Sequence, residues 1–256
     1  MSQKHSPTYT IVFVTIISLV CALLLSITAS SLKKRIDANR ELEINKNILI
    51  ALKVFGTGGL PEDAKEAKKP EVDAFIAARI EFKALDISGK DMELETALIP
   101  KLKPWKQDPD AMRLPVFCLK GESSGYEAYA VPIWGKGLWG QMLGYLSIQA
   151  DGKTVRGVTF FKHIETPGLG AKVDTAEFQD QWIGKTIFDE SGKLTPIVVA
   201  KGAAQVFTKA DPDLMMYHID GMSGATKTGE GVSDMIKTTL AKYEPFLRKL
   251  QKGGAK

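Results

Sequence analysis

A long apolar segment near the N-terminus is the clearest feature of the hydrophobic pattern. No charged side chain occurs from Ser6 to Leu32, and residues 11–27 are mainly Ile, Val, Leu, Phe and Ala. About 20 such residues, rising about 1.5 Å each, cross a bilayer core of about 30 Å. The pattern predicts one transmembrane helix over residues 9–31. A cleaved signal peptide is the alternative, because Lys4 precedes the segment and small residues follow it at 28–31.

Beyond this segment, apolar residues recur at helical spacing from Leu32 to Phe55, with charged residues between them. This spacing predicts a helical stalk. Glycines within residues 56–59, together with Pro61, would end the stalk, because glycine supports a left-handed C-terminal turn and proline cannot continue the ladder. The stretch from Pro61 to Pro70 is rich in Lys, Glu and Ala and predicts a solvated helix or linker.

Short runs of β-forming residues occupy the middle of the chain. They lie at Leu114–Leu119, Tyr126–Trp134, Met142–Ala150 and Thr154–Lys162. The last two runs flank Asp151-Gly152, a favoured hairpin turn because both residues tolerate a positive φ. The runs therefore predict an antiparallel sheet.

The C-terminal part of the chain combines helical and extended patterns. A helix is predicted over Thr175–Ile187, with Asp174 as N-cap and with Phe178 and Trp182 one turn apart on a buried face. A strand is predicted at Pro196–Lys201. The last predicted helix runs from about Gly231 to Gln251, and its apolar face comprises Val232, Ile236, Leu240, Tyr243, Leu247 and Leu250.

This order of elements is typical of an α+β fold, here with an N-terminal membrane helix, a helical stalk and an antiparallel-sheet domain with flanking helices. The expected organisation is a tail at residues 1–8, the membrane helix at 9–31, a juxtamembrane helix with the first part of the soluble region at 32–110, a globular domain at 111–251, and a tail at 252–256.

Composition and charge exclude several classes of protein. With 44% hydrophobic and 25% charged residues the chain is not disordered, and a dispersed net charge of +4 does not favour nucleic-acid binding. Cys21 lies inside the apolar segment, which argues against a disulfide with Cys118. His5, His163 and His218 lack metal-ligand spacing, so each is expected to make local hydrogen bonds and no metal site is expected.

Two glycine-containing loops are the candidates for chemistry. Residues 165–170, with the sequence Glu-Thr-Pro-Gly-Leu-Gly, follow a predicted strand, and residues 220–228, Asp-Gly-Met-Ser-Gly-Ala-Thr-Lys-Thr, lead into the last helix. The second loop suits a phosphate, because glycine lets the backbone approach closely and the following helix contributes its positive end. A plain turn with Ser and Thr caps would have the same composition.

The second loop resembles the flavinylation motif of the FMN-binding domain family. The resemblance implies that Thr226 carries FMN through a phosphodiester, that residues 111–251 are the FMN-binding domain, and that a separate flavin transferase attaches the cofactor. No base lies beside this threonine in the sequence, which argues against self-attachment. The other motif residues are Asp220, Gly221, Ser223, Gly224, Ala225 and Thr228.

Further motifs resemble those of the C subunits of sodium-translocating NADH:quinone oxidoreductases. They are Asn-Ile-Leu at 47–49, Arg-Ile-Glu at 79–81, Gly-Leu-Trp-Gly at 137–140 and His-Ile-Glu-Thr-Pro-Gly-Leu-Gly at 163–170. The resemblance implies a flavin-bearing electron-transfer subunit that is not active alone, within a complex that couples electron flow from NADH to a quinone to Na⁺ export. The alternatives are the shorter G subunit of Rnf-type electron-transport complexes and a membrane-anchored binding protein without redox chemistry.

A tethered flavin ring needs apolar walls and a few polar partners. The candidates are Leu138, Trp139, Glu165, Thr166, Gly168, Leu169 and Gly170. Core packing is the alternative role for Trp139, and a surface charge or a cap is the alternative for Glu165.

Partners and location also follow from the resemblance. It implies the other subunits of the complex as partners, with the bilayer contacted through one helix, and an outward-facing domain on the cytoplasmic membrane. No dinucleotide fingerprint occurs between a strand and a helix. Lys33, Lys34 and Arg35 after the membrane helix favour the opposite orientation by the positive-inside rule, but a large following domain is translocated regardless of charge.

Overall fold

The structure, a computed structural model, describes residues 6–122, 124–204 and 212–253. The chain separates into two compact units, with the boundary between Ile44 and Asn45. Lys4 and His5, and parts of the expected tails at 1–8 and 252–256, lie outside the described residues.

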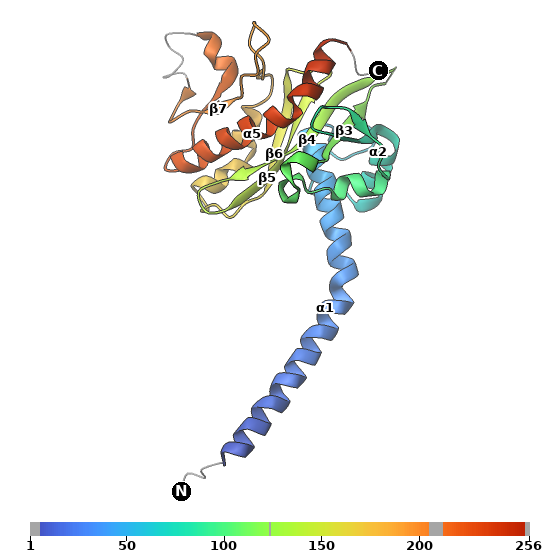
Figure 1. Ribbon diagram of the computed structural model, residues 1–256, viewed down its shortest axis with the longest axis vertical. Coiled ribbons are helices and arrows are strands. Elements are labelled where there is room, and N and C mark those ends of the chain that lie inside the picture. Colours follow the sequence, from blue (N-terminus) through green and yellow to red (C-terminus); the bar gives the residue numbers. More distant parts are fainter. Residues whose placement is uncertain (1–5, 123, 205–211, 254–256) are drawn as a thin grey trace. The chain divides into compact units, whose positions relative to one another are not determined.

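The predicted membrane helix and stalk form a single helix, α1 (Pro7–Ala51) (Figure 1). It contains an 18-residue window with a mean hydropathy of 2.8, none of which is buried inside the protein. By length and composition the helix can cross a bilayer. The helix ends at Ala51, before the glycines predicted to end the stalk, and residues with positive φ follow it, Lys53 at 52° and Gly56 at 80°.

The second unit is built on a six-stranded antiparallel sheet. Its strands, in spatial order, are β2 (Asp91–Met92), β1 (Ile80–Leu85), β3 (Leu114–Lys120), β4 (Tyr126–Lys136), β5 (Gln141–Gln149) and β6 (Val155–Lys162). The α+β class and the strands predicted between residues 114 and 162 are confirmed. Strand β1 pairs with β3 along its whole length, so the sheet crosses the predicted domain limit at residue 111.

Helices and a small second sheet surround these strands. They are α2 (Lys69–Arg79), α3 (Ala176–Asp180), α5 (Thr226–Gln251) and the parallel pair β7 (Val198–Val199) and β8 (His218–Ile219). Short 3₁₀ helices lie at Thr96–Lys101, Pro104–Lys106, Pro109–Ala111, Gly170–Asp174 and Pro212–Tyr217.

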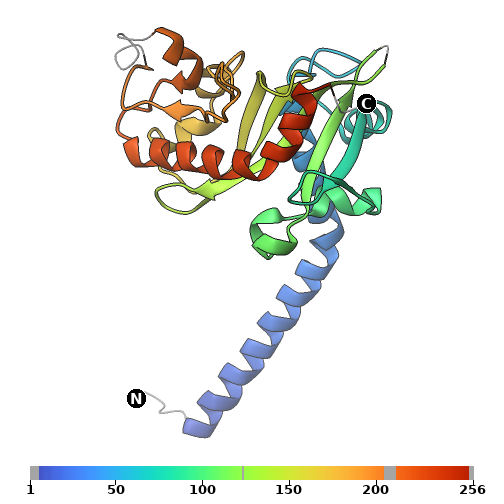
Figure 2. The same cartoon turned by 45° about the horizontal axis from the view of Figure 1, so that its top comes forward.

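Helix α5 lies across one face of the sheet, as Figures 1 and 2 both show. Every residue of its predicted apolar face is buried. Two polar groups fix the crossing: the Tyr243 hydroxyl donates to Pro115 O at 3.0 Å, and Thr239 Oγ1 donates to Trp134 O at 3.3 Å. Burial of large apolar side chains at about 1.5–3 kcal/mol each makes this helix a main source of stability.

The opposite face of the sheet is covered by the last turns of α1 and the residues after it. Ile48, Leu49 and Leu52 are at most 1% exposed. Ser147 Oγ donates to the carbonyl of Ala51, and Arg156 Nε donates to Leu52 O at 2.6 Å. The carbonyls at the end of α1, which lack partners within the helix, therefore find donors in the sheet.

The helix predicted over Thr175–Ile187 is wrong in length, because α3 ends at Asp180. Asp174 does not cap it; its carboxylate lies 3.3 Å from His163 Nε2. Turns follow α3, with Gly184 at φ 79°, and Thr186 pairs with Thr154 beside β6. The pairing with the sheet overrides helical propensity there. The predicted burial of Phe178 and Trp182 is confirmed at 3% and 0% exposure.

The segment from Pro61 to Pro70, predicted as a solvated helix or linker, is mostly turns and so forms a linker before α2 begins at Lys69. Two other predicted limits differ from the structure. The strand predicted at Pro196–Lys201 is reduced to β7. Helix α5 begins at Thr226, five residues before the predicted start. Gly229 and Gly231 lie within it, although glycine is a typical helix breaker. Close packing requires glycine at position 231, because a side chain there would collide with the carbonyl of Lys136.

The cysteines are both free, and Cys118 is buried in the sheet. Burial raises the pKa of its thiol from 9.0 to about 12, so the unfolded chain loses this proton at a lower pH than the folded chain. The contribution to stability is complete below pH 9 and is lost as pH rises towards 12.

In detergent, the destabilisation caused by Cys118→Ala should therefore shrink above pH 9 in urea unfolding. A destabilisation that stays constant to pH 11 would contradict the buried thiol.

Candidate functional site

The hairpin between β4 and β5 presents two apolar side chains to solvent. The backbone N–H of Gly137 donates to Gly140 O at 2.8 Å, which closes the turn. Leu138 is 46% exposed and Trp139 is 62% exposed. Trp139 is therefore not a core residue, and its ring offers a flat apolar surface at the tip of the hairpin.

The loop after β6 contacts this hairpin. Trp139 Nε1 donates to Thr166 Oγ1 at 3.1 Å, and the backbone N–H of Trp139 donates to Glu165 Oε1, also at 3.1 Å. Ile164 is 67% exposed and packs over Gly140, where a side chain would collide with it. The hairpin and the loop are thus joined by both polar and apolar contacts.

The same loop also reaches the residues before α5. Thr166 O accepts from the backbone N–H groups of Leu169 and Ala171, both at 3.1 Å, and Gly168 adopts φ 76°. This turn directs Leu169, which is 43% exposed, towards Gly224, where a Cβ would lie 2.9 Å from Leu169 Cδ2. Gly224 thereby leaves room for Leu169 two residues before Thr226.

The loop that leads into α5 is anchored at its start. Asp220 Oδ1 accepts from the backbone N–H of Ala204 at 2.7 Å, and the N–H of Gly221 donates to Gly202 O at 2.7 Å. A side chain at Gly221 would overlap the carbonyl of Ala200. Asp220, which is exposed, and Gly221 therefore anchor the start of the loop.

A tight turn then delivers Thr226 to the first position of α5. The N–H of Ala225 donates to Met222 O at 3.0 Å, and Gly224 adopts the positive φ of 73° that such a turn requires. The Ser223 and Thr226 side chains are exposed. The N-cap residue Ala225 provides no side-chain hydrogen bond, so the first N–H groups of this 26-residue helix lack the usual cap.

The two threonines of the motif occupy different environments. The side chain of Thr226 is exposed, whereas Thr228 is 1% exposed and its hydroxyl donates to Glu165 Oε2 at 2.5 Å. Within the described part of the chain, the Thr226 hydroxyl makes no hydrogen bond to another side chain. Thr226 is the accessible hydroxyl of the pair.

Charge around the first turn of α5 is positive. Glu230 lies 2.7 Å from Lys227 Nζ and 3.2 Å from Lys201 Nζ. Its hydrogen bond to Lys227, followed by that to Lys201, lowers the pKa of Glu230, and the same contact with Glu230 raises the pKa of Lys227. Because two ammonium groups share one carboxylate, the three side chains carry a net positive charge. This charge adds to the positive end of the helix dipole.

The structure thus brings together most of the residues singled out from the sequence. Leu138, Trp139, Glu165, Thr166, Gly168, Leu169 and Gly170 lie in two loops that contact each other, and Gly224, Ala225, Thr226 and Thr228 lie in the third. Sequence reasoning missed Ile164, whose only signal is its place beside Glu165 in the motif, and the two lysines. Glu165 is not a surface charge, because it is 5% exposed. It is not a helix cap either, because its oxygens accept from the backbone N–H of Trp139 in the hairpin and from the side chain of Thr228.

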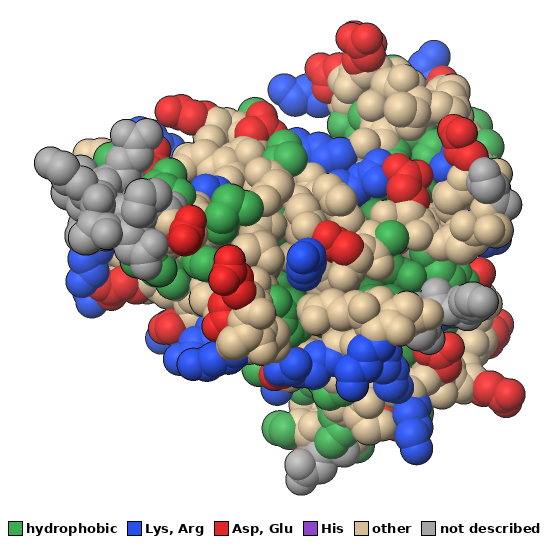
Figure 3. Space-filling view, turned by 90° about the horizontal axis from the view of Figure 1, so that it is seen from above, with side chains coloured by type: hydrophobic (Ala, Val, Ile, Leu, Met, Phe, Trp, Pro, Cys, Tyr) green, Lys and Arg blue, Asp and Glu red, His purple; other side chains and the backbone are tan. Residues whose placement is uncertain are grey.

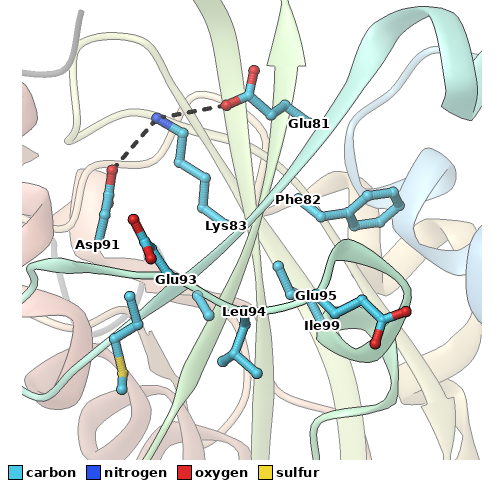
Figure 4. Close-up of a pocket in the computed structure, with 10 residues that line it drawn as sticks. Glu81, Phe82, Lys83, Asp91, Glu93, Leu94, Glu95 and Ile99 are labelled. Atoms are coloured by element: carbon cyan, nitrogen blue, oxygen red, sulfur yellow. Dashed lines mark ion pairs between the residues drawn. The ribbon is translucent and has the colours of Figure 1, made fainter.

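A separate groove of about 530 Å³ lies beside β1 and β2, at the edge of the sheet opposite to β6 (Figure 4). Lys83 lies 3.8 Å from both Glu81 and Asp91 and covers the ring of Tyr126. None of the lining residues belongs to the three loops. Acidic and basic side chains both occur across the molecular face in Figure 3, in keeping with the dispersed charge of the sequence.

Comparison with known families places the three loops in one domain. Residues 137–241 match the model of the FMN-binding domain. The match begins at the first glycine of the Trp139 hairpin and includes Thr226 and the first half of α5. The geometry described above therefore coincides with the part of the chain that matches this domain family.

Relatives match the chain over nearly its whole length. The C subunit of the Na⁺-translocating NADH-quinone reductase of Yersinia pestis is 30% identical, over 96% of this chain and 94% of the relative, and that of Pseudomonas aeruginosa is 29% identical over the full length of both. The crystal structure of the C subunit from Parabacteroides distasonis is 26% identical, covers 84% of this chain and 96% of that chain, and has a TM-score of 0.68. The chain belongs to the family of C subunits of Na⁺-translocating NADH-quinone reductases.

Proposed function

We propose that this chain is an electron-transfer subunit of a Na⁺-translocating NADH:quinone oxidoreductase and that it carries FMN covalently on Thr226. The observation that carries the proposal is the exposed hydroxyl of Thr226 at the uncapped start of α5, between two contacts with the loop after β6. One contact, from Leu169 to Gly224, precedes Thr226, and the other, from Glu165 to Thr228, follows it.

The residues present fit the cofactor. The free N–H groups at the start of α5, with Lys227 and Lys201 nearby, suit a phosphodiester. Trp139 and Leu169 supply exposed apolar surface for a ring, and Thr166 supplies a polar partner. FMN would contribute reversible one- and two-electron redox chemistry, and the protein would contribute position and exclusion of water from one side.

Attachment to Thr226 requires an activated flavin phosphate, because condensation with a free phosphate would have to expel hydroxide. We propose a donor with a phosphoanhydride bond, held by a separate flavin transferase. Thr226 Oγ1 forms the new P–O bond, the anhydride P–O bond breaks, and the leaving phosphate group takes the electron pair. The hydroxyl proton passes to a base of the transferase, since none is bonded to Thr226 among the described residues.

A covalent link suits a stationary relay between neighbouring redox centres. Helix α1 would hold the domain beside the other subunits of the complex, with the FMN domain on the outer face of the cytoplasmic membrane. The full-length match to C subunits supports this assignment over an Rnf-type G subunit. We propose that the FMN-binding residues lie within 111–251, on a sheet that also includes β1 and β2 from before residue 111.

Intact mass spectrometry tests the attachment directly. The full chain is produced with and without a flavin transferase, extracted in detergent and measured before and after tryptic digestion. We expect the mass to rise by one FMN residue only with the transferase, on the peptide that contains Thr226. An unmodified, colourless protein in both preparations would support a binding protein without redox chemistry instead.

A further inference from the structure

Glu165 is the one carboxylate among the described residues that links all three loops of the site. Its side chain is 5% exposed. Oε1 accepts the backbone N–H of Trp139 at 3.1 Å, and Oε2 accepts the hydroxyl of Thr228 at 2.5 Å. A buried carboxylate is costly unless it is paired in this way, and hydrogen bonds to a charged acceptor are stronger than neutral ones.

Glycines in two of the sequence motifs make room for this carboxylate. A Cβ at Gly170 would lie 2.9 Å from Glu165 Oε2 and 2.5 Å from Thr228 Oγ1. A Cβ at Gly137 would overlap Glu165 Oε1. Both glycines therefore leave the space that the Glu165 carboxylate occupies. This packing role does not depend on contact between the glycines and a ligand.

The backbone of Glu165 is held in turn from its other side. Its N–H donates to His163 Nδ1 at 3.3 Å, so that nitrogen is the acceptor and the proton of a neutral ring is on Nε2. His163 Nε2 then donates to Asp174 Oδ2 at 3.3 Å. The chain of contacts runs from Asp174 through His163 to Glu165, which fixes the direction in which its side chain leaves the loop.

We infer that Glu165 is a positioning residue that ties the Trp139 hairpin to the first turn of α5. Because both its oxygens are engaged by protein donors, it acts through Trp139 and Thr228 rather than on a ligand. The consequence for a flavin rests on the proposed function. Glu165 would fix the position of the Trp139 hairpin relative to the hydroxyl oxygen of Thr226, to which FMN would be attached. Loss of the carboxylate should loosen the hairpin, which would then be held to the loop by its contacts with Thr166 and Ile164.

The first test uses the full chain made without transferase, in detergent. Lys136 directly precedes the hairpin and is exposed, so trypsin reports opening there. For Glu165→Ala we expect the rate of cleavage after Lys136 to rise about tenfold. Loss of the charge-assisted hydrogen bond to the hairpin should raise the fraction of molecules with an open hairpin by about that factor. Glu165→Gln should stay within about twofold of wild type, because its amide oxygen and NH₂ can still serve Trp139 and Thr228.

Controls separate this role from general stability. Glu177→Ala removes an exposed glutamate and should leave cleavage unchanged. Wild-type cleavage in a folded Glu165→Ala chain, or failure of Glu165→Gln to restore it, would overturn the inference. If Glu165→Ala unfolds entirely, Thr228→Val decides instead: faster cleavage after Lys227 supports the inference, and an unchanged rate rejects it.

The second test uses the flavinylated chain and reads a signal that a purely structural role would not change. With Glu165→Ala we expect FMN still on Thr226 but with lower flavin emission anisotropy, and Glu165→Gln should restore the wild-type value. Unaltered anisotropy in Glu165→Ala would reject the effect on the cofactor. If the wild-type chain takes up no flavin, the proposed attachment fails, while the tryptic comparison still decides the role of Glu165.

Discussion

Thr226→Ala is expected to abolish covalent flavin completely in cells that contain the transferase. The substitution removes the one oxygen proposed to form the phosphodiester, and the side chain is exposed at the start of α5, so the fold should change little. Surface substitutions of this kind alter the free energy of unfolding by about 0.5 kcal/mol or less. In-gel flavin fluorescence and intact mass measure the loss, and thermal unfolding checks the fold.

Two matched variants make this expectation specific. Thr226→Ser keeps a hydroxyl at the same place and should retain flavin. Thr228→Ser also keeps a hydroxyl but sits where the side chain is 1% exposed and bonded to Glu165, so FMN should remain on Thr226. Flavin found on residue 228 in Thr226→Ala would contradict the difference in accessibility on which the assignment depends.

The hairpins of the sheet were predictable because their signals are local. Runs of β-forming residues and the Asp151-Gly152 turn place β5 and β6 to within about one residue, and Gly152 has the expected positive φ of 70°. Strand β1 is different, since its partner β3 begins at Leu114, 29 residues after β1 ends at Leu85. Such non-local pairing leaves little trace in a single run of residues.

The helix limits failed where tertiary contacts oppose local propensity. Phe178 and Trp182 have helical spacing, but the chain leaves α3 at Asp180 so that Thr186 can pair with Thr154. Gly229 lies inside α5 because it faces Val199, where a Cβ would lie 3.0 Å away. A glycine selected for close packing cannot be told from a helix breaker by sequence alone.

The candidate site shows the same division between local and non-local information. The motifs indicate which loops belong to it, because each combines turn residues with apolar ones. They do not indicate that Glu165 is buried, since a glutamate between Ile164 and Thr166 is typical of a surface position. Its burial depends on donors that come from Trp139 and Thr228, which are 26 and 63 positions away.

Gly144→Ala is expected to destabilise the sheet strongly, although it adds a single methyl group. Gly144 lies in β5 where the register with β6 shifts, opposite Phe160. A Cβ there would overlap the backbone carbonyl of Thr159, and backbone cannot move aside as a flexible side chain can. Overpacking of this kind costs about 3 kcal/mol, towards the upper end of its usual range. Urea unfolding of the detergent-solubilised chain measures the loss.

The same substitution should reach the site through β6. The register shift sets the direction in which β6 leaves the sheet towards His163 and Glu165, so a distorted bulge should displace the loop that carries them. Flavinylation of Gly144→Ala is therefore expected to fall together with its stability.

Gly121→Ala is the matched control, because the nearest atom to a Cβ at this position would lie at an ordinary 3.5 Å. Its free energy of unfolding should stay within about 0.5 kcal/mol of that of wild type. Equal stability of the two variants would show that the sheet accommodates a side chain at position 144, and the bulge would then not be what directs the loop.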